Sequence, residues 1–126
     1  MNDLSELQKI IDKDHRYSID AYLFVLEALF STRKKERIKG HITGRQLLEG
    51  IRDLALQRYG LMTKTVFEHW GVRETIDFGN IVFNMVNEKI LGKTEHDRIT
   101  DFKNIYDFNE VFVNSYKMDV KETEDK

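Results

Sequence analysis

The sequence predicts an all-α fold, a compact bundle of five or six helices. Apolar residues recur at spacings of three and four along most of the chain, which is the period of one helix face. Proline is absent from all 126 residues, so helix ends must be marked by glycine or asparagine, which adopt left-handed cap conformations readily. A winged-helix-like arrangement with a short hairpin after residue 90 is the second interpretation of the same pattern.

Two helices are expected in the first third of the chain. Residues 3–13 carry apolar side chains at helical spacing. Ser18 is expected to cap a second helix that continues to about residue 35. Its middle, residues 21–30 (AYLFVLEALF), is apolar on every side apart from Glu27. Such a helix belongs at the centre of a fold or in an oligomer contact, so a homo-oligomer remains an open alternative.

Three more helices follow from cap signals. Thr43 and Gln46 have the spacing of a capping box and predict a helix over residues 44–59. A short helix is expected over residues 62–70, with Val66, Phe67 and Trp70 facing inward. Asp77 is expected to cap the next helix, which continues to about residue 90. The glycines expected to end these three helices are Gly60, Gly71 and Gly92, and the polar residues expected to face water on the last of them are Asn80, Asn84, Asn87 and Glu88.

The end of the chain is less regular. Residues 93–106 are compatible with a helical turn, a hairpin wing or a loop. Asp107 and Glu110 form an acidic version of the capping box and predict a last short helix over residues 108–116. We therefore expect one helical domain over residues 1–116 and a charged, disordered tail over residues 117–126.

Composition narrows the classes of protein. The net charge of −2 excludes a generally basic nucleic-acid binder, although residues 33–45 hold six Lys or Arg against one Glu. The absence of cysteine excludes disulfides and cysteine-based zinc sites. The longest nearly apolar run has ten residues, about 15 Å as a helix and half of a bilayer core. The first residues also lack the pattern of a secretory signal, so we expect a cytoplasmic protein without membrane contact.

Signals for catalysis are missing from the sequence. It contains no Gly-x-Ser-x-Gly, no Gly-rich phosphate loop and no histidine pair at metal-binding spacing on a helix. We therefore expect no cofactor, no metal and no catalytic residue.

The candidate binding surface has two parts. They are the basic stretch that precedes Thr43, which we call the basic connector, and the helix start formed by Thr43, Gly44 and Arg45. A helix start exposes unpaired amides, Gly44 lets a ligand approach the backbone, and Arg45 is able to grip a carboxylate or phosphate. The alternative is purely structural: Thr43 caps, Gly44 fits the turn, and Arg45 pairs with Glu27 or Glu49. The candidate binding residues are Arg33, Lys34, Lys35, Arg37, Lys39, His41, Thr43, Gly44 and Arg45, with Arg73 after the 62–70 helix.

The expected function is a non-catalytic binding module for a protein or ribonucleoprotein partner. One alternative is a winged-helix-like nucleic-acid-binding protein, which is weaker because the would-be recognition helix, LMTKTVFEHW, lacks Arg, Asn and Gln. The other is a small enzyme that acts on an anionic ligand with His41, Arg45 and Glu49.

Several motifs resemble those of a small bacterial domain family of uncharacterised function. In order, they are His-x-Thr-Gly-Arg, Leu-Leu-Glu-Gly-Ile-Arg, His-Trp-Gly-Val-Arg, Asp-Phe-Gly-x-Ile-Val-Phe and Lys-Thr-Glu. The resemblance spans about Tyr17 to Phe112. It implies a compact, stand-alone domain and assigns no activity, ligand or functional residue.

Overall fold

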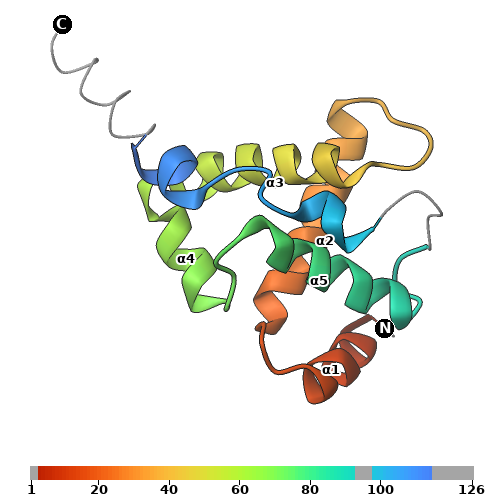
Figure 1. Ribbon diagram of the computed structural model, residues 1–126. Coiled ribbons are helices and arrows are strands. Elements are labelled where there is room, and N and C mark those ends of the chain that lie inside the picture. Colours follow the sequence, from red (N-terminus) through yellow and green to blue (C-terminus); the bar gives the residue numbers. More distant parts are fainter. Residues whose placement is uncertain (1–2, 93–97, 115–126) are drawn as a thin grey trace, which may run out of the picture.

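The computed structural model describes residues 3–92 and 98–114. Within these residues the regular secondary structure is all helical, with no strand (Figure 1). The all-α prediction is confirmed. The hairpin wing considered after residue 90 is wrong for residues 98–106, which contain a 3-10 turn, while residues 93–97, Tyr116 and the tail lie outside the described part. The elements are α1 (Asp3–Lys13), α2 (Ile19–Lys35), α3 (Gly44–Tyr59), η1 (Gly60–Met62), α4 (Thr63–His69), α5 (Thr75–Asn87), η2 (Ile99–Phe102) and the π-helical turn η3 (Asn109–Asn114).

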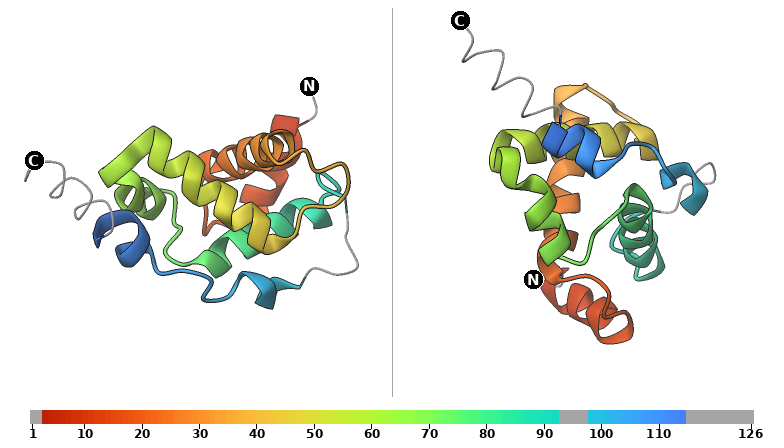
Figure 2. Two further views of the ribbon diagram at one scale, coloured as in Figure 1. Left: turned by 90° about the horizontal axis from the view of Figure 1, so that it is seen from above. Right: turned by 60° about the vertical axis from the view of Figure 1, so that its left-hand side comes forward.

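The central helix is α2, which packs against α1, α3 and α5 (Figures 1 and 2). Ala21, Val25 and Ala28 are fully buried on one of its sides. The opposite side is open, because Leu23 is 41% and Phe30 71% exposed. The apolar residues on all sides of α2 therefore serve two different surroundings: one face is buried in the core, and the other is exposed.

An aromatic cluster joins the helices at the α4 end of the core. Phe67 of α4 is fully buried at its centre. Its ring lies 5.2–5.9 Å, between centroids, from the rings of Phe24, Trp70, Phe78, Phe108 and Phe112. The cluster therefore connects α2, α4, α5 and η3 through ring contacts.

The predicted capping box at the start of α3 is confirmed. The Thr43 hydroxyl accepts a hydrogen bond from the Gln46 N–H at 3.1 Å, and the Gln46 side-chain oxygen accepts one from the Thr43 N–H at 2.9 Å. Ser18 is the N-cap residue of α2, as predicted, but its hydroxyl makes no capping hydrogen bond and is buried without a partner among the described residues. Helix α5 begins two residues before Asp77, whose carboxylate accepts from two backbone N–H groups ahead of it.

Two helices end at cationic residues in place of glycine. Gly60 follows α3 and Gly71 lies just beyond α4, both with positive φ. However, α2 and α5 end before Arg37 and Lys89, which have φ of 55° and 61°. At both ends the next N–H reaches a carbonyl five residues back, as in a Schellman motif. The prediction that Gly92 ends α5 is therefore wrong, since Lys89 holds the left-handed position.

Residues 99–106 pack across the starts of α3 and α5. The ring of Phe102 is buried against Gly44 and Gly79, where an added Cβ would come within 3.0 and 2.8 Å of it. The Thr75 hydroxyl donates to the Phe102 carbonyl at 2.6 Å and accepts from the Ile105 N–H at 3.1 Å. Two helix glycines, which ordinarily weaken a helix, are thus needed here for close packing.

None of the helices in the described ranges has the length and apolar content of a membrane span.

Candidate binding groove

An open groove of about 850 Å³ lies where the ends of α2 and α5 meet the start of α3. Most of the side chains that line it are apolar, and they come from elements that are distant in sequence. The apolar lining residues are Leu29, Ile42, Leu47, Val82, Phe83, Val86, Leu91 and Phe102. This size and composition are typical of ligand and peptide sites.

Among the residues that the structure describes, the groove lining contains two cations and no acidic side chain. Arg33 lies on the α2 side, Lys89 on the α5 side and His41 on the connector, and the remaining polar lining comes from Thr43, Asn87 and glycine backbone. The chain as a whole has more acidic than basic residues, 22 against 20. The lining therefore has a local charge opposite to the net charge of the protein.

The basic connector is exposed. The Arg33 guanidinium donates a hydrogen bond to the Gly40 carbonyl at 3.0 Å. Four cations of the candidate surface are exposed at the end of α2 or on the connector: Lys34, Lys35, Arg37 and Lys39. Arg33 and His41 line the groove itself, whereas these four are not among its lining residues.

The start of α3 offers fewer open backbone groups than its sequence suggests. The capping box occupies the N–H groups of Thr43 and Gln46. Gly44 is buried against the Phe102 ring, so this glycine accommodates a neighbouring side chain. Arg45 points away from the lining and lies 3.8 Å from Glu49 in an exposed i, i+4 pair. The structural roles predicted for these residues are therefore present.

Arg73 lies elsewhere. It precedes the first residue of α5, whereas the groove is formed by residues from Val82 onward at the other end of that helix. A helix of 13 residues is about 20 Å long. The structure does not bring Arg73 together with the connector cations.

The residues proposed for an enzyme do not converge on one cavity. His41 lines the groove, but Arg45 and Glu49 do not. Within the described ranges, no three histidine or carboxylate side chains gather as metal ligands would. No observation at this site favours the enzymatic alternative.

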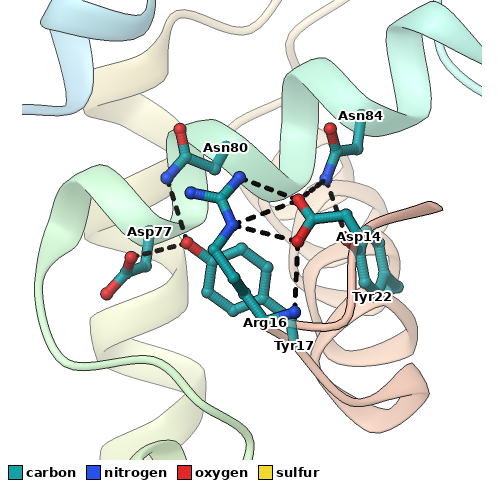
Figure 3. A network of polar contacts seen from close by, with 7 residues as sticks. All are labelled: Asp14, Arg16, Tyr17, Tyr22, Asp77, Asn80 and Asn84. Atoms are coloured by element: carbon teal, nitrogen blue, oxygen red, sulfur yellow. Dashed lines mark hydrogen bonds and ion pairs between the residues drawn. The ribbon is translucent and has the colours of Figure 1, made fainter. Parts of the chain in front are cut away.

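A second polar cluster, which the sequence did not indicate, joins the α1–α2 connection to α5 (Figure 3). Asn84 donates to Asp14 and to the Tyr22 hydroxyl, both at 3.0 Å. Asn80 donates to the Tyr17 hydroxyl at 3.0 Å, which in turn donates to Asp77 at 2.6 Å. The prediction that Asn80 and Asn84 face water is therefore wrong: both are half-buried because the hydroxyls of two tyrosines reach them.

The electrostatics of this cluster favour a structural role. Arg16, which bonds both carboxylate oxygens of Asp14, holds the pKa of that group well below its usual range. Burial opposes this effect and the Asn84 amide adds to it. Burial also raises the pKa of Tyr17 and of Tyr22. The polar groups of the cluster bond one another, which leaves them poorly placed to bind a ligand.

Asp14→Asn is expected to lower the free energy of unfolding at neutral pH by about 1–2 kcal/mol. A carboxylate whose pKa is lowered by folding stabilises the fold above its unfolded pKa of about 3.9 and loses that contribution as the pH falls. The gap between wild type and variant should therefore narrow progressively below about pH 4. Urea unfolding across a pH series measures it. Asp12→Asn is the control, because Asp12 is exposed and accepts only from Gln8; equal losses in both variants would contradict the role of the cluster.

No family model matches the chain, and searches of curated proteins and of solved structures found no significant match. The family resemblance of the motifs therefore stays a prediction.

The α5 wall of the groove is the part of the site that sequence reasoning missed. Val86 of α5 and Lys89 just beyond the end of α5 are separated from the basic connector by about forty residues, so only the tertiary packing of α5 against α2 brings them to it. The left-handed conformation of Lys89 also has no sequence signal, because glycine is the usual residue there.

Proposed function

We propose that this protein is a non-catalytic protein-binding module whose groove accepts an acidic segment of a partner protein through apolar anchor side chains. The observation that carries the proposal is the pairing of an apolar groove with the lining cations Arg33 and Lys89, with no carboxylate among the lining residues that the structure describes. Apolar anchors supply binding free energy, and opposite charges at the rim supply orientation and a faster encounter.

The conformation of Lys89 supports this proposal. A left-handed conformation costs a non-glycine residue about 1–2 kcal/mol, and at a helix end glycine avoids that cost. Here the residues are the cations Arg37 and Lys89, at the ends of the two helices that border the groove. Backbone strain concentrates at functional sites. Lys89 lines the groove and Arg37 does not, so a requirement for positive charge at the groove accounts for the conformation of Lys89 alone.

A protein partner fits the lining better than a nucleic acid does. Nucleic-acid contacts are dominated by phosphate groups, which require cations and hydrogen-bond donors. This groove offers eight apolar side chains and two permanent cations, Arg33 and Lys89. Leucine or aromatic side chains at helical spacing, flanked by glutamate or aspartate, match that chemistry.

The test is binding of a labelled acidic amphipathic peptide of about 15 residues, with leucines at helical spacing and glutamates between them. A second peptide, with lysine in place of every glutamate, is the charge control. We expect the acidic peptide to bind in fluorescence anisotropy, with affinity that falls as salt rises. In nuclear magnetic resonance spectra, its addition should shift the backbone amides of Val86, Asn87 and Leu91.

Two substitutions at one position separate binding from folding. Lys89→Glu is expected to weaken acidic-peptide binding about three- to tenfold, because it replaces a favourable rim contact with a repulsive one. Lys89→Gly should also weaken binding, yet leave stability unchanged or raise it by up to about 1 kcal/mol, because glycine adopts the left-handed conformation freely. Arg73→Glu makes the same charge change away from the groove and should leave affinity unaltered.

Several outcomes would overturn the proposal. These are equal binding of the acidic and basic peptides, amide shifts located away from the groove, or equal effects of Lys89→Glu and Arg73→Glu. A single-stranded RNA oligonucleotide that displaces the peptide and binds more tightly would assign the site to nucleic acid. A fatty acid that does so would assign it to a small amphiphile.

A further inference from the structure

The exposed side of α2 carries a regular apolar seam. Ile19, Leu23, Leu26 and Phe30 follow one another at spacings of four, three and four residues, which is the seam of a helix that packs along another helix. Phe30 is 71% and Leu23 41% exposed, while Ile19 and Leu26 are half-buried at the edges. We refer to these four residues as the outer seam of α2.

The charges at the two ends of this helix are opposite. Asp20 lies in the first turn, and Arg33, Lys34 and Lys35 lie in the last turn. Neither Asp20 nor Lys34 forms a side-chain hydrogen bond or ion pair within the part of the chain that the structure describes. Arg33, in contrast, is bonded to the Gly40 carbonyl. Asp20 and Lys34 are therefore a complementary pair that one chain does not bring together, because the helix itself separates them.

We propose that the outer seam of α2 is a homodimer interface in which the α2 helices of two copies pack antiparallel about a two-fold axis. We set the two-fold axis between Leu26 and Glu27 of both helices. Leu23 and Phe30 then lie at equal distances from the axis on opposite sides, so Leu23 of each copy faces Phe30 of the other. The same register sets Asp20 of each copy beside Lys34 of the other. In a two-fold symmetric contact each pair of residues occurs twice. The Asp20–Lys34 ion pair therefore forms at both ends of the interface, and the exposed side chains of Leu23 and Phe30 are covered in both copies.

Glu27 lies near the centre of this interface and would meet its own symmetry copy. Its carboxylate is already bound by the Arg58 guanidinium of α3, which contacts both of its oxygens and holds its pKa below the usual range. The like charges at the axis are thus neutralised within each chain. The antiparallel arrangement also sets opposite ends of the two helix dipoles side by side.

This inference is independent of the proposed peptide-binding function. The four seam residues do not line the groove, and neither do Asp20 or Lys34. A failure of peptide binding would leave the dimer unaffected, and the reverse also holds.

The test is the mass of the full chain in solution, by sedimentation equilibrium and light scattering over a range of concentrations. One chain has a mass of 15.0 kDa, and we expect twice that value at high concentration. Phe30→Glu is expected to give a monomer with an unchanged circular dichroism spectrum, since the side chain is mostly exposed and its loss leaves the core intact.

A charge-swap series tests the register. Asp20→Lys alone and Lys34→Glu alone each set like charges together at both ends of the dimer, and each should raise the dimer dissociation constant about tenfold or more. The double variant restores opposite charges and should return to within about threefold of wild type. A chain that stays monomeric at every concentration would overturn the proposal, as would a double variant no better than the singles. A dimer that survives Phe30→Glu would assign the contact to another surface.

Discussion

Phe67→Ala is expected to lower the free energy of unfolding by about 3–5 kcal/mol. The side chain is fully buried, and its ring contacts five other rings. Truncation removes the buried area and leaves a cavity, which the surrounding rings fill only in part because their own backbones are held in different helices. A small domain is stable by about 5–15 kcal/mol, so the loss is a large share of the total.

Equilibrium urea unfolding of Phe67→Ala measures the effect. The matched control is Phe30→Ala, which removes the same atoms from a side chain that is 71% exposed. In dilute solution, where a dimer contributes little, this control is expected to change stability by less than about 0.5 kcal/mol. Similar losses in the two variants would contradict the placement of Phe67 at the centre of the core.

The contrast between these two phenylalanines shows what the sequence can predict. Helical spacing placed Phe67 and Trp70 inward on their short helix, and both are buried. Helical spacing does not predict which side of residues 21–30 is buried, because apolar residues on every side of a helix do not mark one face. Only the packing of α3 and α5 against one side of α2 identifies Leu23 and Phe30 as exposed.

Cap signals predicted the start of α3 and the ends of α3 and α4 at Gly60 and Gly71. The Thr43 and Gln46 pair acts locally, so its geometry follows from the sequence alone. The end of α2 was expected at about residue 35 and lies there. The end of α5 was misplaced because the rule for helix ends relies on glycine, and Lys89 adopts positive φ in its place. The candidate site was predicted only in part. The sequence indicated the basic connector, but it did not indicate the apolar lining that α5 contributes to the groove.

Two polar residues of α5 were assigned to the wrong surroundings for a related reason, whereas Asn87 is exposed as predicted. Asn80 and Asn84 lie beside the apolar face, and a polar residue is by default assigned to solvent. The hydroxyls of Tyr17 and Tyr22 instead reach them from α2 and the chain before it. A hydrogen bond between residues sixty or more positions apart has no local sequence pattern.

Gly71→Ala is expected to lower the free energy of unfolding by about 2–4 kcal/mol, through two separate causes. The first is conformational, since Gly71 has a φ of 91°, which alanine adopts only with strain. The second is steric, since an added Cβ would lie 2.0 Å from the Arg16 carbonyl oxygen. That carbonyl is part of the backbone and is held close, because the Ser18 N–H donates to the Trp70 carbonyl at 3.1 Å.

Thermal and urea unfolding compare Gly71→Ala with Gly40→Ala. Gly40 has no heavy atom within 4 Å of an added Cβ, and its replacement should change stability by no more than about 0.5–1 kcal/mol, in the stabilising direction. Gly71→Asn separates the two causes, because asparagine tolerates positive φ better than alanine yet still carries a Cβ. If the contact with Arg16 dominates, Asn is at least as destabilising as Ala. Recovery of most of the stability by Asn would assign the effect to conformational strain. An alanine variant as stable as wild type would contradict the close approach of Gly71 to the Arg16 carbonyl.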